Sequence, residues 1–406
     1  MTIRSRTSVF LTWAGLLAAS LLLTGCPPKP ITLETALERL APSDYPDFGD
    51  DARYDQLAQA IEMSLAYLRK LPSDRLVVFG PDSYTVAHLI RSLETFAAIA
   101  QENPAAETLN RVIRERYRVY AAAGDAETRK VLFTGYYEPL LQGSLTASPE
   151  FPVAINSRPA DLVEIDLSLF ADDLKGRRIV GRYAGRSVTP YPAREQIRRE
   201  PDFERLAPPL AWVRDEVDLS NLMIQGSGKV ALADGRLLQI QFDVSNGHPF
   251  RSIGRLLIDQ GKISAERISM QTIREYLRQH PSEAPAILNH NPRYIFFRLA
   301  ESGPVGALAV PITPLRSIAV DRSLFPSAAL AFISVPVPKV DALGRIARFE
   351  PRNAFVLAQD AGSAITGAGR VDLFWGHGPE AELAAGHMKN EGRLYFLVLA
   401  PEPPAP

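Results

Sequence analysis

Two aspartates, Asp360 and Asp372, lie at the ends of apolar, strand-like runs within residues 354–376. A glycine-rich turn segment, residues 361–370, separates them. Glycine adopts backbone conformations that other residues resist, and it lets another chain approach closely. An acid at a strand end beside such a segment can therefore face an open groove. The residues around Asp372 in sequence are apolar: Val371, Leu373, Phe374 and Trp375.

This pattern suits cleavage of a glycosidic bond, which requires a proton for the leaving oxygen while positive charge develops on the sugar ring. A carboxylic acid can donate that proton when an apolar setting or a neighbouring negative charge raises its pKa. The residues around Asp372 meet the first condition, and Asp360 can meet the second or supply a hydrogen bond. The pattern nominates Asp372 as a catalytic acid supported by Asp360, although an Asp at a strand end is more often structural.

Two other segments carry groups that suit a sugar ligand. Tyr136, Tyr137 and Glu138 precede a proline, and tyrosine rings can stack on sugar faces while their hydroxyls meet sugar hydroxyls. Gln225 and Ser227 lie on a glycine loop, where amide and hydroxyl groups suit hydroxyl- and acetamide-rich ligands. On the sequence alone, core packing at a strand end explains the tyrosine segment as well as sugar binding does. A tight hairpin explains the glycine loop equally well.

The sequence lacks the residues that several other classes of enzyme need for catalysis. The sequence has no Gly-x-Ser-x-Gly elbow and no phosphate-binding loop, and its single cysteine stands at the end of an apolar leader. Of the six histidines, no pair has the spacing of metal ligands on a helix; His377 and His387, in a glycine-rich loop, are more simply explained as exposed loop residues than as metal ligands. We therefore expect no metal site.

The whole-chain composition limits the partners. The 406 residues suffice for two or three domains, and 45 basic against 46 acidic residues give a net charge near zero. This balance argues against a nucleic-acid binder, which relies on phosphate neutralisation, but is compatible with a glycan partner. The 33 prolines favour irregular, β-containing structure over a helical bundle.

Residues 1–26 form a basic start, an apolar run and the ending Leu23-Thr24-Gly25-Cys26. This is typical of a bacterial signal peptide. The ending resembles a lipoprotein box, in which the thiol of Cys26 is lipidated and becomes the mature N-terminus. Because residue 27 is Pro rather than Asp, we expect anchorage at the periplasmic face of the outer membrane. The alternative is an ordinary signal peptide with a chance cysteine.

Periodicity predicts helices in the first third of the chain and mostly short strands afterwards. One expected helix is capped by Asp50 or Asp51 and stopped by Pro72, with Leu57, Ile61, Leu65 and Leu68 on one face. The other expected helices are 33–40, 85–100, 105–122, 252–260 and 268–278. The expected strands are 131–137, a hairpin over 229–242 that turns at Asp234-Gly235, then 294–299, 307–310, 317–320, 329–335, 355–358, 371–375 and 394–400. The closely spaced strands after residue 300 are typical of a small closed barrel.

At these residues the chain resembles the membrane-bound lytic murein transglycosylase A family, over about residues 131–399 and in the expected order. Each motif is modest alone, but the set is specific. The matching segments are Thr134-Gly135-Tyr136-Tyr137-Glu138-Pro139, Ile224-Gln225-Gly226-Ser227-Gly228, Asn246-Gly247-His248, Arg251-Ser252-Ile253-Gly254, Ser269-Met270-Gln271, Asn291-Pro292, Phe296-Phe297, Val320-Asp321-Arg322-Ser323 and residues 354–376.

The resemblance implies a mainly β fold with N-terminal helices: a double-psi β-barrel domain, an inserted second β-rich domain, and a groove between them. The expected divisions are a lipoprotein signal peptide over 1–26, an N-terminal helical part of the first domain over 27–139, an inserted substrate-binding domain over 140–295 and the barrel part of the first domain over 296–400. The last part also resembles the three-aspartate domain, whose acids would be Asp321, Asp360 and Asp372.

The resemblance also implies the reaction. Family members cut the β-1,4 bond between N-acetylmuramic acid and N-acetylglucosamine in peptidoglycan without water, using one acid. Motif matching places that acid on Asp372, with Asp360 and Asp321 in support, and no metal or organic cofactor is required. Two departures are the absence of the family's lysine, which Thr366 replaces, and Arg370-Val371 in place of a His-Phe pair that some relatives have.

Two alternatives remain at this point. One is a non-catalytic, expansin-like peptidoglycan-binding lipoprotein on the same barrel. The other is an ordinary hydrolase that uses Asp360 and Asp372 as a carboxylate pair. In each case the expected partners are peptidoglycan strands and a membrane, with no nucleic acid; protein partners in cell-wall synthesis or division are unknown.

Overall fold

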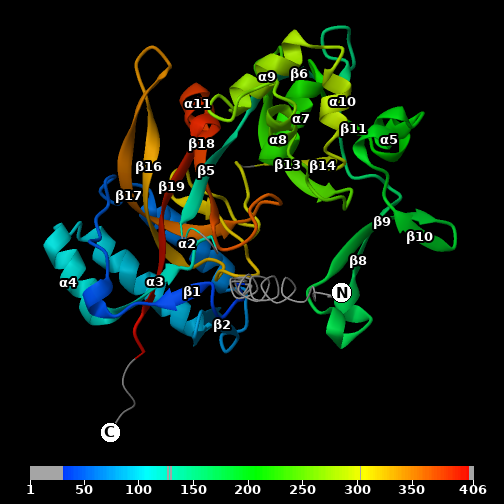
Figure 1. The fold of residues 1–406 in the computed structure, drawn as a ribbon. Coiled ribbons are helices and arrows are strands. Elements are labelled where there is room, and N and C mark those ends of the chain that lie inside the picture. Colours follow the sequence, from blue (N-terminus) through cyan, green and yellow to red (C-terminus); the bar gives the residue numbers. More distant parts are fainter. Residues whose placement is uncertain (1–30, 126–127, 129, 302, 402–406) are drawn as a thin grey trace, which may run out of the picture.

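The computed structural model describes residues 31–125, 128, 130–301 and 303–401, so the predicted signal peptide and Cys26 lie outside the described residues. The fold is mainly β, with two large sheets side by side (Figure 1). Within the described ranges, no helix combines the length and apolar character needed to cross a membrane.

The first large sheet closes into a six-stranded barrel. Its strands pair in the ring β5-β18-β15-β17-β16-β19, and β19 pairs again with β5. The pairs β15–β17 and β18–β5 are parallel and the others antiparallel, which agrees with the double-psi β-barrel that the resemblance implies. Two further strands, β4 and β1, extend this sheet from β19. The bounds are β1 Leu37–Arg39, β4 Tyr117–Ala122, β5 Val131–Glu138, β15 Ser317–Ala319, β16 Leu330–Val340, β17 Ile346–Asp360, β18 Arg370–His377 and β19 Lys389–Leu399.

Helices from the first third of the chain pack on this barrel and share its hydrophobic core (Figure 1). Each presents an apolar face, as its periodicity predicts. A fully buried ion pair between Arg316 and Asp50 ties the N-terminal segment to the barrel, with two N–O distances of 2.6 and 2.9 Å. The helices are α2 Leu57–Leu68, α3 Val86–Gln101 and α4 Ala106–Arg116, and a small hairpin, β2 Leu76–Phe79 and β3 Asp82–Thr85, lies between the first two in sequence.

The second large sheet has six strands in the order β14-β13-β12-β6-β11-β7 and a separate hydrophobic core. A three-stranded sheet, β8 to β10, extends from it (Figure 1). The strands are β6 Leu140–Ser144, β7 Val153–Asn156, β8 Leu162–Asp166, β9 Arg178–Ala184, β10 Ser187–Pro190, β11 Pro209–Val213, β12 Ser227–Ala231, β13 Leu237–Ser245 and β14 Ile295–Ala300. The helices are α5 Arg194–Arg199, α6 Phe203–Leu206, α7 Glu216–Gln225, α8 Ile253–Asp259, α9 Met270–Gln279 and α10 Ala284–Asn289.

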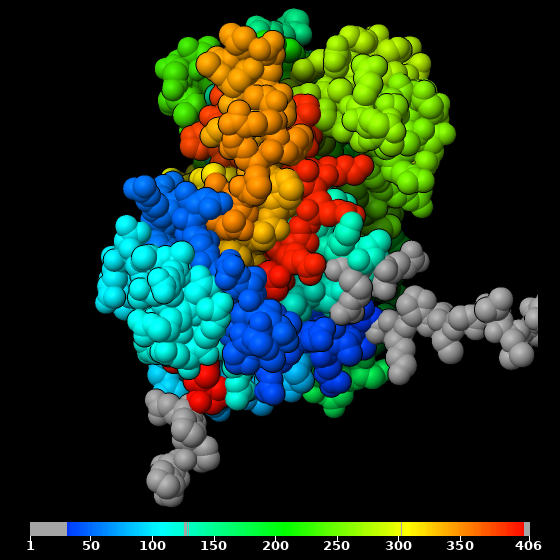
Figure 2. All heavy atoms as spheres, turned by 60° about the vertical axis from the view of Figure 1, so that its left-hand side comes forward, coloured from blue at the N-terminus to red at the C-terminus, as the bar shows by residue number. Residues whose placement is uncertain are grey.

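The two halves touch where α9 meets α11, Pro379–His387, the helix between β18 and β19 (Figure 2). Arg274 of α9 forms an ion pair with Glu382 of α11. Gly135 of β5 lets α11 lie close to the barrel, because a Cβ atom there would meet the Ala385 backbone at 2.7 Å. The domain boundaries expected from the sequence stay a prediction.

Most sequence-based elements are confirmed. The helices over 85–100, 252–260 and 268–278 are present, as is the hairpin with Gly235 at φ +85°. The helix expected before Pro72 is also present, but it spans only Leu57–Leu68. The barrel strands expected at 317–320, 329–335, 355–358, 371–375 and 394–400 are also present, several of them longer than expected.

Four expectations are wrong. Residues 33–40 hold β1 instead of a helix, and the second half of the expected helix 105–122 is β4, because its aromatic residues pair with β19. Asp50 caps no helix, since its carboxylate binds Arg316 and Gln56 precedes α2. Residues 307–310 form a loop, in which Ala309 has φ +56°.

Candidate active site

A cavity of about 410 Å³ lies between the barrel and the six-stranded sheet. The barrel side contributes Asp360, Asp372 and Tyr136, together with small residues of the 305–312 loop. The opposite wall comes from the end of α7 and from strands β12 to β14. The structure thus brings the two nominated acids to one pocket that both halves of the chain build.

Strand register explains why the two acids share the pocket. Ala319 of β15 is the register partner of Asp360 on β17 and of Asp372 on β18. The two aspartates therefore lie two strands apart, about 10 Å between Cα atoms, with the small Ala319 side chain between them. This spacing leaves room for a ligand over Ala319.

Both carboxylate oxygens of Asp360 are engaged. The Tyr136 hydroxyl donates to Oδ2 at 2.7 Å, and the backbone N–H groups of Ala307 and Ala361 donate to Oδ1, each at 2.8 Å. The Ala307 N–H reaches Asp360 because Gly306 packs against β17, where a Cβ atom would meet the Gln359 carbonyl at 2.6 Å. Burial raises the pKa of Asp360, and these three donors lower it. Asp360 is thus held as an acceptor.

Asp372 has the opposite environment. It is partly exposed at the pocket, but its Oδ1 is buried and has no hydrogen-bond partner among the described residues. Burial raises the pKa of Asp372 to about 7; Thr134 and Arg370 lower this pKa, and the Asp360 charge raises it. A carboxyl group with this pKa can hold a proton near neutral pH and release it to a ligand.

Tyr136 contacts one of the two acids, Asp360. Its ring packs against Phe374 at 5.1 Å between centroids, and its hydroxyl holds Asp360. Burial raises its pKa well above the ordinary value, as do the charges of Asp360 and Asp372. The hydroxyl therefore stays a hydrogen-bond donor.

The nominated glycine loop borders the pocket from the other side. Gly226, with φ +81°, ends α7 and turns the chain into β12, so that Gln225 and Ser227 both line the cavity. The Gln225 side chain also accepts a hydrogen bond from the Tyr137 N–H at 3.0 Å. Gln225 therefore joins the two walls as well as bordering the pocket.

Three nominated residues lie outside the pocket lining. Tyr137 is 2% exposed and its hydroxyl accepts from Asn221, while Glu138 is 1% exposed beside Lys229 at 3.4 Å. These two residues lie at the joint between the sheets, and their expected contact with substrate stays a prediction. Asp321 accepts the Gly367 N–H at 2.7 Å and thereby holds the turn between Asp360 and Asp372.

Sequence reasoning missed two arginines of the pocket, Arg293 and Arg298. Arg293 directly follows the motif Asn291-Pro292, so the motif pointed to its neighbourhood. Nothing in the local sequence around Arg298 distinguishes it from a solvent-facing strand residue. Among the described residues, no group of three or more His, Cys, Asp or Glu side chains could hold a metal ion.

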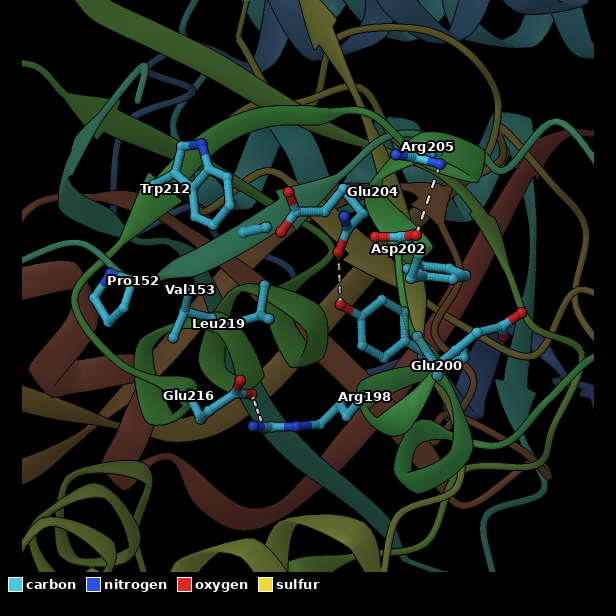
Figure 3. A pocket seen from close by; sticks show the side chains of 15 residues that line it. Pro152, Val153, Arg198, Glu200, Asp202, Glu204, Arg205, Trp212, Glu216 and Leu219 are labelled. Carbon is cyan, nitrogen blue, oxygen red and sulfur yellow. Dashed lines mark hydrogen bonds and ion pairs between the residues drawn. The ribbon is translucent and has the colours of Figure 1, made fainter. Parts of the chain in front are cut away.

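A second cavity, of about 530 Å³, lies within the six-stranded half beside Trp212 and Tyr294 (Figure 3). It is rich in carboxylates, but ion pairs with arginines hold several of them: Glu200 with Arg182, Asp202 with Arg205, and Glu216 with Arg198. Neither nominated acid lines this cavity.

The comparisons with known proteins agree with this geometry. Residues 132–298 match the model of the MltA specific insert domain, and residues 316–398 match the model of the 3D domain. A crystal structure of a membrane-bound lytic murein transglycosylase from Agrobacterium tumefaciens is 32% identical, with a TM-score of 0.73 over 90% of this chain and 98% of that chain. The chain belongs to the membrane-bound lytic murein transglycosylase A family.

Other relatives support the same family. Membrane-bound lytic murein transglycosylase A of Escherichia coli K12 is 33% identical over 275 residues, which are 67% of this chain and 66% of the relative. The fold also matches a crystal structure of Escherichia coli MltA with bound chitohexaose, at 24% identity and a TM-score of 0.65, over 90% of this chain and 95% of that one. In family terms, the pocket at Asp372 lies between the insert domain match and the 3D domain match.

Proposed function

We propose that the protein is a lytic transglycosylase of peptidoglycan and that Asp372 is its single acid and base. The substrate class comes from the family, whose named members are murein transglycosylases. The role of Asp372 rests on its site. One oxygen is buried and has no hydrogen-bond partner among the described residues, burial raises the pKa to about 7, and the pocket is open between two walls.

The reaction has two proton transfers. Asp372 begins protonated and donates to the glycosidic oxygen as the bond between that oxygen and C1 of the muramoyl sugar breaks. Its carboxylate then takes the proton from the muramoyl C6 hydroxyl, whose oxygen bonds to C1 and closes a 1,6-anhydro ring. Asp372 ends protonated, no water is consumed, and the products are an anhydro-muramoyl end and a free N-acetylglucosamine end.

Asp360 assists this reaction electrostatically but does not itself transfer a proton. Three donors occupy its oxygens, so it is poorly placed to activate water as a second catalytic carboxylate. Its charge lies across Ala319 from Asp372, where it raises the pKa of the acid and favours positive charge on the sugar ring. This arrangement supports the lytic reaction over a two-carboxylate hydrolase.

We further propose that lipidation of Cys26, which lies outside the described residues, anchors the enzyme at the periplasmic face of the outer membrane. The ending Leu23-Thr24-Gly25-Cys26 and the membrane-bound name of the family support this placement.

Product analysis tests the function. Purified peptidoglycan is digested and the soluble fragments are weighed by mass spectrometry. Fragments lighter by one water molecule than hydrolysed ones are expected. Water-added fragments would instead indicate a hydrolase, and a lack of fragments with retained sacculus binding would indicate a binding protein.

The variant Asp372→Asn tests the residue. It keeps the shape of the side chain but cannot transfer the proton, so we expect the rate to fall about 1000-fold with sacculus binding retained. The matched control is Asp243→Asn, which removes a half-buried strand carboxylate that pairs with Arg158 and lies outside the pocket. Full activity of Asp372→Asn would refute the assignment.

A further inference from the structure

The wall of the acid pocket that faces the barrel acids is basic. The charged side chains that line the pocket are Asp360 and Asp372 from the barrel, and Arg293 and Arg298 from the other wall. When Asp372 is protonated, as its first step requires, one carboxylate faces two guanidinium groups. The pocket then carries a net positive charge.

Neither arginine is committed to a carboxylate of the protein. Arg298 lies on β14 next to its register partner Gln241, which also lines the pocket; its side chain is exposed and has no ion pair or hydrogen bond among the described residues. Arg293 is half-buried, and one of its N–H groups donates to the His248 carbonyl at 3.3 Å. Burial lowers the pKa of Arg293, and no described carboxylate lies within ion-pair distance of it.

The arginines do not hold the barrel acids in place either. The groups that set the pKa of Asp372 are Thr134, Arg370 and Asp360, all from the barrel. Asp360 is held by Tyr136 and two backbone N–H groups. Two guanidinium groups with no ion pair among the described residues, both lining one pocket, are thus available to bind an anion supplied by the ligand.

The chemistry of the proposed substrate identifies that anion. The sugar rings of peptidoglycan carry neutral hydroxyl and acetamide groups. Its negative charges are carboxylates on the muramoyl side: the lactyl carboxylate where the stem peptide is absent, and the carboxylates of the stem peptide where it is present. A neutral chitin-type oligosaccharide has neither.

We propose that Arg298, assisted by Arg293, binds a carboxylate of the muramoyl unit and so makes the enzyme prefer murein over neutral glycans. The preference rests on the proposed function. Arg298 is a specificity-determining residue rather than a catalytic one. It recognises substrate from the wall opposite the reacting acid.

Binding to three ligands tests the proposal in the catalytically silent Asp372→Asn protein. The ligands are chitohexaose, which has no carboxylate; murein strands freed of peptide by an amidase, which have the lactyl carboxylate; and peptide-bearing strands. Isothermal titration gives a dissociation constant for each, with and without Arg298→Gln. We expect Arg298→Gln to lower the affinity ratio of carboxylate-bearing strand to chitohexaose by about 10-fold, as for loss of a partly exposed charged contact.

The two murein ligands distinguish the source of the carboxylate. If Arg298→Gln lowers the affinity ratio only for peptide-free strands, the bound carboxylate is that of the lactyl group. If it lowers the ratio only for peptide-bearing strands, the bound carboxylate is one of the stem peptide. Arg293→Gln should act in the same direction but less strongly, because one of its N–H groups serves the His248 carbonyl. The matched control is Arg236→Gln, an arginine on the β12–β13 turn that pairs with Asp234 away from the pocket.

An affinity ratio that Arg298→Gln leaves unchanged for both murein ligands would overturn the inference. The proposed function fails differently: the protein with Asp372 intact would then release no anhydro fragments. Because Arg298 is exposed, its variant should fold, and circular dichroism checks this.

Discussion

Two cavities of the described structure, one within the six-stranded half and one between the halves, differ in how they treat carboxylates. In the cavity of the six-stranded half, Glu216 is ion-paired with Arg198 (Figure 3). Both oxygens of Glu200 accept from Arg182 at 2.9 Å. In the pocket between the halves, Asp372 has no ion pair within the described part of the chain, and one of its oxygens has no partner. In the first cavity arginines neutralise these carboxylates, whereas in the second a carboxylate oxygen of Asp372 is free to carry a proton.

The difference teaches that acid content alone does not identify a glycosidase site. Burial raises the pKa of Glu216, as it does that of Asp372, but Arg198 and Arg194 oppose the shift at Glu216. At Asp372 burial is opposed by Thr134 and Arg370, neither of them in an ion pair with it among the described residues, and the Asp360 charge adds to burial, so the pKa reaches about 7. An acid with no contacting cation, near a second acid that is fully hydrogen-bonded, is the arrangement that suits proton transfer.

Among measurements that leave the sequence unchanged, the pH profile should show the largest effect. The first step needs protonated Asp372, so kcat/KM should be full below about pH 6 and fall tenfold per unit above pH 7. At pH 9 the expected loss is about 100-fold. Turbidity clearing of sacculi at constant ionic strength measures it, and a flat profile from pH 7 to 9 would contradict the role of Asp372.

The raised pKa of Asp372 also makes the stability of the folded protein depend on pH. The folded state raises the pKa of Asp372 above its unfolded value near 4, so it binds the proton more tightly than the unfolded chain does. The resulting stabilisation is full below about pH 4 and is lost as pH rises through about 7. Urea unfolding of the wild type and of Asp372→Asn should therefore diverge across this window, with the wild type losing stability relative to the variant as pH rises.

The barrel and part of the candidate site could be predicted from the sequence. The apolar runs at β15 to β19 predicted the closed barrel, and the motifs nominated Asp360, Asp372, Tyr136, Gln225 and Ser227, all of which the structure places in one pocket. That they act on substrate stays a proposal. Strand alternation explains the limit at β5: Tyr136 and Tyr137 point to opposite faces, so only one can line the pocket.

The features that sequence missed depend on contacts between distant segments. Residues 117–122 have a helical apolar spacing, but pairing with β19 makes them the strand β4. The 305–312 loop, expected as a strand over 307–310, instead gives its Ala307 N–H to Asp360. Arg298 meets the acid pocket only after the two halves assemble. The local sequence pattern does not reveal contacts between segments that are far apart in the chain.

Removing the Tyr136 hydroxyl should have an intermediate effect. Tyr136→Phe keeps the ring against Phe374 but leaves Asp360 Oδ2 without its donor. We expect kcat to fall about 10-fold, the cost of one hydrogen bond to a charged group, with little change in KM. The alkaline limb should move as well, because the Asp360 charge acts on Asp372. Unchanged kcat and pH profile would show that the hydroxyl does not tune the pair.

Glu216→Gln should have the smallest effect on activity, and it tests the comparison from the other cavity. The change leaves Arg198 without its carboxylate, so we expect unfolding to become easier by about 1–2 kcal/mol in urea, the range for a partly exposed pair. Activity should stay within about twofold, because Glu216 begins α7 and lies about 15 Å along that helix from Gln225, which borders the acid pocket. A tenfold loss of activity at unchanged stability would show that α7 couples the cavities, and the contrast between a structural and a chemical carboxylate would no longer hold.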